Sequence, residues 1–175
     1  MPKLWDLYNK CGEKTDISHE RGKQIPQGYY HLVVSVWIVN NQGQFLISQR
    51  HPSKPYPNVW ECTGGSAIAG ESSLQCAVRE VKEELGISLE SHTAKMIYQT
   101  RREQQQEFYD VWLFRADVPL SELSLQESEV VAASWLNFEE ILELQRAMKL
   151  HPLIDYLADI EFFVKNREWQ KIEYL

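Results

Sequence analysis

The sequence predicts an α/β protein in which a mixed sheet lies between layers of helices. Two observations lead to this fold class. Short apolar stretches rich in Val, Ile and Trp, separated by polar turns, occur on both sides of one amphipathic helix that ends near Gly86. Two more helical stretches follow near the end of the chain, so both faces of a sheet can be covered.

The N-terminal segment predicts a β-hairpin. Leu4–Tyr8 has the composition of a short strand, and residues 9–12, Asn-Lys-Cys-Gly, are typical of a turn. Residues 12–28 are polar and include Pro26 and Gly28, so we expect a loop there.

The next segment predicts the centre of the sheet. His31–Val39 is expected to form a central strand, which a turn at residues 40–43 joins to a strand at Phe45–Gln49. Residues 51–58 contain three prolines and should cross the surface. Trp60–Thr63 then forms a short strand that leads into the amphipathic helix.

The C-terminal half predicts more strands and then two helices. The expected strands are Ala94–Thr100, Phe108–Ala116 and Val131–Leu136. Asn137 is a candidate cap for a helix at Phe138–Met148. A second helix is expected at Leu153–Val164, directly after Pro152.

Length and composition limit the function classes. The 175 residues fit one domain, with the hairpin in residues 1–28, a core in 29–140 and helices in 138–175. A net charge of −7 argues against binding a nucleic-acid duplex. No apolar run is long enough to span a membrane, and no signal peptide is apparent. Three cysteines without paired spacing indicate free thiols and a cytoplasmic protein. The sequence leaves a homodimer open.

The helix before Gly86 carries the strongest functional signal. Glu80, Glu83 and Glu84 fall on one narrow arc at about 100° per residue. The apolar residues of the helix fall on a separate arc: Leu74, Ala77, Val78, Val81 and Leu85. Three ionised carboxylates this close repel one another, which a divalent cation would relieve. Oxygen ligands favour Mg²⁺ or Mn²⁺ as the cation. Because Mg²⁺ typically binds both protein carboxylates and substrate phosphates, a phosphate-containing substrate is expected.

The residues around this arc have physical reasons of their own. Gly65 follows Thr63-Gly64 and can bring a backbone carbonyl close to a metal. Glu71 lies where the helix opens, and Arg79, two turns later, can pair with it as a bidentate fork. The alternative is a solvated acidic helix face, but the flanking glycines and the fixed spacings make that interpretation weaker.

The segment Gly65–Ile87 resembles the signature of the Nudix hydrolase family at every fixed position. It reads Gly, five spacers, Glu, seven spacers, Arg-Glu, an aliphatic residue, a spacer, Glu-Glu, a spacer, Gly and an aliphatic residue. The likeness extends over roughly residues 29–140. Many members carry Glu where this chain has Ile68. The resemblance implies a Nudix-like α/β/α sandwich with a central mixed sheet, and hydrolysis of a nucleoside diphosphate linked to another group X.

The resemblance also implies roles for the signature residues. Glu80 and Glu84 are expected as primary metal ligands, and Glu83 as a third ligand or as a group just outside the ligand set. Gly65 can add its carbonyl. The cofactor is expected to be Mg²⁺ or Mn²⁺, with a small-molecule diphosphate as substrate.

Three catalytic assignments complete this set. Arg79 and Glu71 orient the helix. The general base in this family is either a signature Glu, here Glu80 or Glu83, or a Glu on a later loop. Glu129 and then Glu127 are the loop candidates, and both can instead be solvated.

Four residues are assigned to substrate binding: Arg50, Tyr56, Trp60 and Glu107. Tyr56 or a tryptophan (Trp37, Trp60 or Trp112) can stack on a base. Cys62 and Cys76 lack a neighbouring His and are interpreted as packed thiols.

The sequence leaves two alternative functions. Residues 4–8 and 56–61 resemble the isopentenyl diphosphate isomerase branch of the family. The catalytic Cys of that branch, however, is expected near Gly64, where this chain has no Cys. Of its Glu-x-Glu motif, this chain retains only Glu107. A non-catalytic nucleotide sensor would be expected to lose signature carboxylates, and all are present here.

Overall fold

The computed structural model describes residues 2–172 of the chain. The strands are β1 (Leu4–Asn9), β2 (Lys14–Glu20), β3 (Tyr29–Val39), β4 (Phe45–Arg50), β5 (Trp60–Glu61), β6 (Thr63–Ser66), β7 (Ala94–Arg102), β8 (Glu107–Arg115) and β9 (Val130–Leu136). The helices are α1 (Ser73–Leu85), α2 (Phe138–Arg146) and α3 (Leu157–Lys165). None of the helices in residues 2–172 is both long and apolar enough to cross a membrane.

The mixed sheet is organised around β3. Strand β8 runs parallel to β3 and carries β7 antiparallel on its other edge, while β6 pairs antiparallel with β3. Strand β4 pairs with β3 only at Val39–Phe45 and then joins β5 and β9. The sheet therefore divides into two branches, and residues 60–66 pass from one branch to the other.

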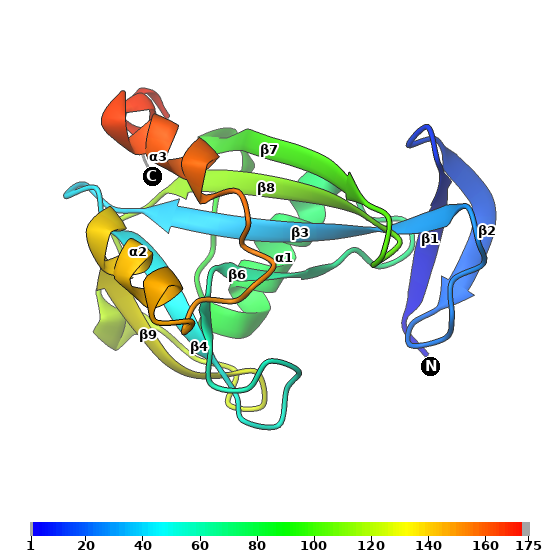
Figure 1. The fold of residues 1–175 in the computed structure, drawn as a ribbon, viewed down its shortest axis with the longest axis horizontal. Coiled ribbons are helices and arrows are strands. Elements are labelled where there is room, and N and C mark those ends of the chain that lie inside the picture. Colours follow the sequence, from blue (N-terminus) through cyan, green and yellow to red (C-terminus); the bar gives the residue numbers. More distant parts are fainter. Residues whose placement is uncertain (1, 173–175) are drawn as a thin grey trace.

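Helices cover both faces of this sheet, as the sequence predicts. Val34, Val36 and Ile38 of β3 point toward α1, whereas Trp37 and Val39 point into the core beneath α2 and α3. This alternation of successive β3 side chains separates two apolar cores. Figure 1 shows α1 behind the sheet, with α2 and α3 on the near side.

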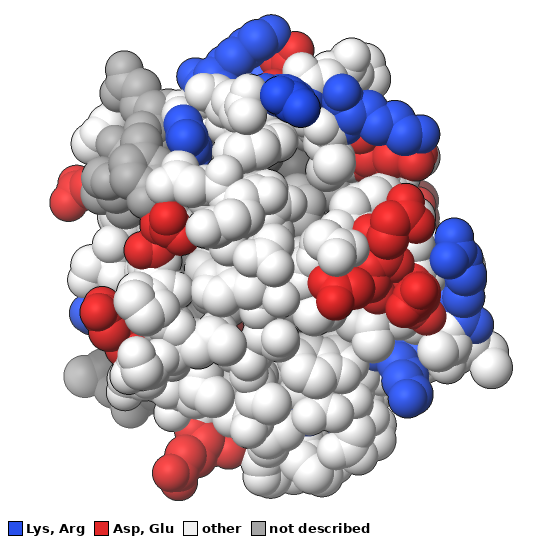
Figure 2. Space-filling view, turned by 90° about the vertical axis from the view of Figure 1, so that its left-hand side faces the viewer, with Lys and Arg blue, Asp and Glu red and all other residues white. Residues whose placement is uncertain are grey.

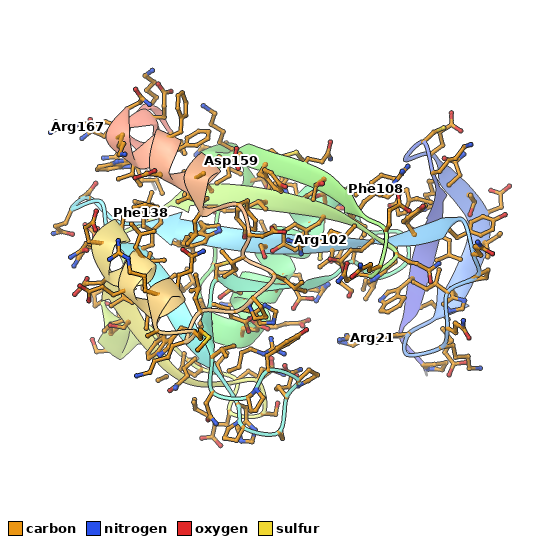
Figure 3. All side chains as sticks on the ribbon, in the orientation of Figure 1. Arg21, Arg102, Phe108, Phe138, Asp159 and Arg167 are labelled. Carbon is orange, nitrogen blue, oxygen red and sulfur yellow. The ribbon has the colours of Figure 1, made fainter. Side chains whose placement is uncertain are left out.

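The N-terminal hairpin is present, and it extends further than the sequence suggests. Strand β2 lies within residues 12–28, where a loop was predicted, and it pairs antiparallel with β1. That prediction was wrong because β2 is exposed along most of its length and therefore lacks an apolar alternation. The hairpin lies at one end of the molecule (Figure 1), and Arg21 at its foot points toward the body (Figure 3).

The predicted helix at Leu153–Val164 begins four residues later than expected, at Leu157. Residues 153–156 are non-helical because their side chains and carbonyls make separate contacts with the rest of the protein. Ile154 and Tyr156 are buried, and the carbonyl of Leu153 accepts a hydrogen bond from Arg102. Asn137 caps α2 as predicted, with Glu140 completing a capping box.

The surface at the α2–α3 end carries mixed charge. Figure 2 shows acidic side chains gathered on one part of this face, with Lys and Arg side chains mainly along its margins. Among the described residues, no continuous basic surface is visible in that view. This distribution agrees with the net charge of −7.

Candidate active site

Helix α1 is fixed at both ends. Ser72 and Gln75 form a capping box at its start, which satisfies two backbone donors that the helix leaves free. Gly86 ends the helix in the left-handed region at φ 76°. A Cβ at Gly86 would lie 2.8 Å from Ser124 Cβ, so glycine is required there on two grounds.

Arg79 joins helix α1 to the loop before it. Its Nε and Nη2 donate to the two oxygens of Glu71 at 2.8 and 2.9 Å, which confirms the predicted bidentate pair. Nη1 also donates to Glu80 at 2.8 Å and to Glu83 at 3.1 Å. Because one guanidinium binds three carboxylates, it fixes the carboxylate arc against residues 66–71.

Glu80 lies against the Gly65 backbone. Its side chain is buried, and burial raises its pKa although the Arg79 charge lowers it. A Cβ at Gly65 would lie only 2.4 Å from the Glu80 carboxylate, so a larger residue would displace it. The Gly65 carbonyl, predicted as a metal ligand, faces the Cys76 thiol at 3.8 Å.

Glu84 is the most electrostatically costly group of the site. Burial raises its pKa well above the ordinary value, and the nearby charges of Glu80, Glu61 and Glu129 raise it further. A hydrogen bond from the Gly64 backbone opposes this only in part. We call Glu61, Glu80, Glu84 and Glu129 the carboxylate cluster.

The carboxylate cluster has the chemistry of a divalent-metal site. Within residues 2–172, no three acidic, His or Cys side chains already converge on one ion-sized position. The donor set nevertheless fits a hard cation, since it consists of carboxylate oxygens whose mutual repulsion is only partly compensated. A bound divalent ion would supply the missing positive charge.

The two loop candidates for the general base differ in position. Ser124 N and Gln126 N donate to the last carbonyls of α1, those of Leu85 and Glu84, so the loop is tied to the helix. Glu129 is half-buried, acts on Glu84 through its charge and forms an ion pair with Lys54. Glu127 is exposed. The structure thus brings Glu129, and not Glu127, to the carboxylate cluster.

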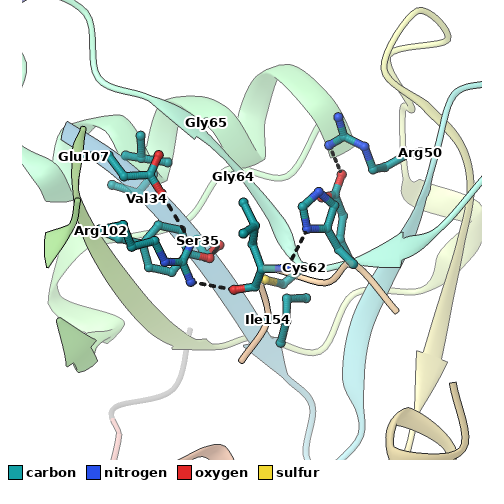
Figure 4. A pocket seen from close by; sticks show the side chains of 14 residues that line it. Val34, Ser35, Arg50, Cys62, Gly64, Gly65, Arg102, Glu107 and Ile154 are labelled. Carbon is teal, nitrogen blue, oxygen red and sulfur yellow. Dashed lines mark hydrogen bonds and ion pairs between the residues drawn. The ribbon is translucent and has the colours of Figure 1, made fainter. Parts of the chain in front are cut away.

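A cavity of about 180 Å³ lies beside the cluster and is lined by residues from several strands and from the segment before α3. Figure 4 shows an Arg–Glu ion pair on each of two sides of this cavity. Arg102 donates to Glu107 at 3.3 Å and lies 3.7 Å from the centre of the Tyr109 ring. Arg50 donates to Glu61 at 2.6 Å, next to the cluster. The cavity is therefore small, and charged and apolar residues line it together.

Two of the four predicted substrate-binding residues line the cavity, and the other two do not. Arg50 and Glu107 line the cavity. Trp60 is half-buried and packs against the core, and the exposed Tyr56 contacts the edge of the cavity residue His151 at 4.7 Å between ring centroids.

The other aromatic candidates for stacking on a base are occupied elsewhere. Trp37 is fully buried and donates to Tyr156, so it cannot stack on a ligand. Trp112 lies on the α1 side of the sheet, where its indole donates to Ser73.

Sequence reasoning assigned no site role to Glu61 or His151, and it offered Lys54 and Arg102 only as basic residues that could meet a nucleotide phosphate. Glu61 follows Trp60 in a two-residue strand, which is too short to show an alternation. Lys54 lies in the proline-rich loop, and nothing in its local sequence points to Glu129. Arg102 had a signal in the Arg101-Arg102 pair, but only the fold shows that it turns inward.

Cys62 and Cys76 are packed thiols in the structure. Cys62 lines the cavity, and burial raises its pKa to about 12, so it stays protonated at neutral pH. Burial and the charges of Glu80 and Glu71 raise the pKa of Cys76. Neither environment activates a thiolate.

Comparisons with known proteins agree with this geometry. A family model described as the NUDIX domain matches residues 29–157. An uncharacterised Nudix hydrolase of Listeria monocytogenes is 41% identical over 152 residues, which cover 85% of this chain and 88% of that protein. The CTP pyrophosphohydrolase of Escherichia coli is 31% identical over 118 residues, covering 67% of this chain and 84% of that protein.

A solved structure shows the same fold. A crystal structure from Deinococcus radiodurans superposes with a TM-score of 0.74 at 23% identity, and the match covers 89% of this chain and 98% of that one. At this identity the likeness concerns the fold alone. It agrees with the mixed sheet between helices that the sequence predicts.

Proposed function

Because the chain belongs to the Nudix hydrolase family, we propose that it hydrolyses a diphosphate linkage in a nucleoside diphosphate joined to another group X. Nudix hydrolases generally use divalent metal ions and act on small-molecule diphosphates. The observation that carries the proposal is the carboxylate cluster, with its uncompensated charge, next to a cavity lined in part by charged side chains. The name of the Escherichia coli relative, a pyrophosphohydrolase, supports the same reaction type.

The carboxylates of α1 have the first role in this proposal. Glu80 and Glu84 would hold the metal, Mg²⁺ or Mn²⁺, with Glu83 and the Gly65 carbonyl as further ligands. Bound there, a divalent ion supplies positive charge for the phosphoryl group and makes water easier to deprotonate. Arg79 keeps Glu80 and Glu83 in place by its bonds to both and to Glu71.

The remaining residues act on water and substrate. Glu129 accepts the proton of the attacking water, since its carboxylate lies with Glu84 and is held by Lys54. Arg50 and Glu107 bind polar groups of the substrate in the cavity, and its small volume admits one compact group. We also place the protein in the cytoplasm, because its three cysteines are free.

The test is a panel of nucleotide substrates assayed with Mg²⁺, Mn²⁺ or EDTA. The panel contains nucleoside diphosphate sugars, ADP-ribose, dinucleoside polyphosphates, damaged nucleotides and prenyl diphosphates. We expect metal-dependent release of phosphate or a nucleoside monophosphate from at least one of them. Turnover that persists in excess EDTA would contradict the metal role. Isomerised prenyl diphosphate without hydrolysis, or tight nucleotide binding without turnover, would replace the proposal with one of the two alternatives.

A further inference from the structure

The N-terminal hairpin carries a cation toward the carboxylate cluster. Arg21 follows β2 at the foot of the hairpin, and its backbone N–H donates to the Lys3 carbonyl at 2.9 Å, which fixes the turn. Figure 3 shows the Arg21 side chain leaving the hairpin in the direction of the body. The residue lies outside the signature segment Gly65–Ile87, so the signature assigns it no role.

The hairpin is anchored to the loop that precedes helix α1. Ala69 N donates to the Leu4 carbonyl at 2.8 Å, and Gly70 N donates to the Asp6 carboxylate at 2.7 Å. Asp6 is also paired with Lys14 of β2 at 2.8 Å. Because both strands of the hairpin are connected to this loop, the foot of the hairpin has a defined position relative to the site.

The charge of Arg21 is not neutralised by the protein. Its side chain is exposed, and it has no hydrogen bond or ion pair with any described residue. Lys23 on the same turn, in contrast, pairs with Glu20 at 2.6 Å. Its backbone partner Lys3 nevertheless shares a cavity with Arg79 and Glu83 of α1, so the Arg21 turn lies beside the acidic face of this helix.

An exposed guanidinium that points toward the body of the molecule, with no partner among the described residues, is free to bind a further group. A phosphate fits, because its oxygens match the donor fork of Arg and its negative charge would otherwise add to that of the carboxylate cluster. A cavity of about 370 Å³ between Lys3–Leu4 and Ile68–Ala69 extends to Glu83 and keeps this side of the site open.

We propose that Arg21 is a substrate-binding residue whose guanidinium binds a phosphate group of the substrate on the hairpin side of the carboxylate cluster. This inference rests on the proposed hydrolase function. It makes the N-terminal hairpin part of the active site, although the matched family domain begins only at residue 29.

The test compares Arg21→Gln with Lys23→Gln, which removes the same charge from the same turn. For the best substrate of the panel, Arg21→Gln should raise KM about ten- to a hundredfold, the loss expected for a charged hydrogen bond, with kcat within about threefold. Arg21→Lys should restore part of the loss, and Lys23→Gln should behave as wild type. Equal effects of the two Gln variants, or a loss confined to kcat, would overturn the proposal.

A binding measurement separates this proposal from the hydrolase function. Inorganic diphosphate is titrated calorimetrically into each variant with Mg²⁺ present, and the melting temperature of each confirms folding. Weaker diphosphate binding in Arg21→Gln alone supports the role of Arg21, even if no panel substrate is hydrolysed. Normal diphosphate binding and normal KM in Arg21→Gln refute it, even if the wild-type protein is an active hydrolase.

Discussion

Individual carboxylates are the reason why we propose a cation at this site. Glu84 is half-buried among three other acidic side chains, and both its burial and their charges disfavour its ionised form. Among the described residues, Arg79 binds the carboxylates of Glu71, Glu80 and Glu83 but not that of Glu84. The part of the cluster farthest from Arg79 is therefore where a divalent ion would relieve the most repulsion.

The first prediction concerns Glu84→Gln. We expect kcat to fall by roughly two to four decades, the scale of losing a catalytic carboxylate or its metal. The metal-free variant should remain folded, because Gln keeps the shape of the side chain and removes one repelling charge. Steady-state kinetics with saturating Mg²⁺ and circular dichroism check both parts. Glu143→Gln, an exposed change on α2, is the control, and near-normal kcat in Glu84→Gln would contradict the role.

At the scale of residues, the sequence predicts contacts between side chains that lie close together in the chain. Glu71 lies just before helix α1, and Arg79 lies eight residues later, about two helical turns along. Because the rise and turn of a helix are regular, this spacing is enough to predict their pairing. The closeness of Glu61 to Glu84 and the pairing of Lys54 with Glu129 were not predicted, because these partners are 23 and 75 residues apart in the chain. Only the branching of the sheet brings these segments together.

At the scale of elements, the loop after α1 has a function that its composition does not reveal. Its backbone bonds to the helix end fix the loop, and Glu129 is further held from the proline-rich loop by Lys54 and by His51 N, which donates to the Glu129 carbonyl at 2.8 Å. Glu127 lacks this support. The structure therefore supports the order of candidates, Glu129 before Glu127, while the identity of the base stays a prediction.

The second prediction tests that order. Glu129→Gln should lower kcat by about two to three decades at unchanged metal affinity, since a base must lie within hydrogen-bond reach of its water. Glu127→Gln is the matched control from the same loop and should keep wild-type kcat. The measurement is kcat at saturating metal, with metal affinity from titration. Wild-type rates in the double variant would return the role to Glu80 or Glu83 on the helix.

Elements with a strong internal pattern were predictable, and those stabilised by partners were not. Strand β3 has buried residues on both faces and Asn137 caps α2, so both are visible in the sequence. Strand β2 forms because β1 offers it backbone partners, not because of an apolar face. Residues 153–156 stay non-helical because Arg102, distant in sequence, binds the Leu153 carbonyl.

At the scale of the whole molecule, one aromatic contact links the hairpin to the sheet. The rings of Trp5 in β1 and His31 in β3 stack at 4.0 Å with an interplanar angle of 18°. His31 is buried, and its Nδ1 has no hydrogen-bond partner among the described residues. Burial, with the positive charges of Arg21 and His19, lowers its pKa to about 4. Glu107 lies 4.0 Å away but is bound by Arg102, so burial prevails.

The third prediction is that acid weakens the protein through His31. Its pKa is about 4 in the folded protein and 6.5 ordinarily, so between these values the unfolded chain binds a proton that the folded protein excludes. Stability therefore falls as the pH falls through this window. From pH 7 to pH 5 the contribution of His31 amounts to about 2 kcal/mol of unfolding free energy.

The variant His31→Gln isolates this effect. It removes the stack on Trp5 and should be less stable than wild type at pH 7, but its stability should decline less between pH 7 and pH 5. His151, whose pKa is also lowered to about 4 by burial, is unchanged in both proteins, so its effect cancels in the comparison. Denaturant unfolding at both pH values gives the two differences. Parallel declines in wild type and variant would show that His31 is protonated in the folded protein, and the hairpin would then dock on a charged ring.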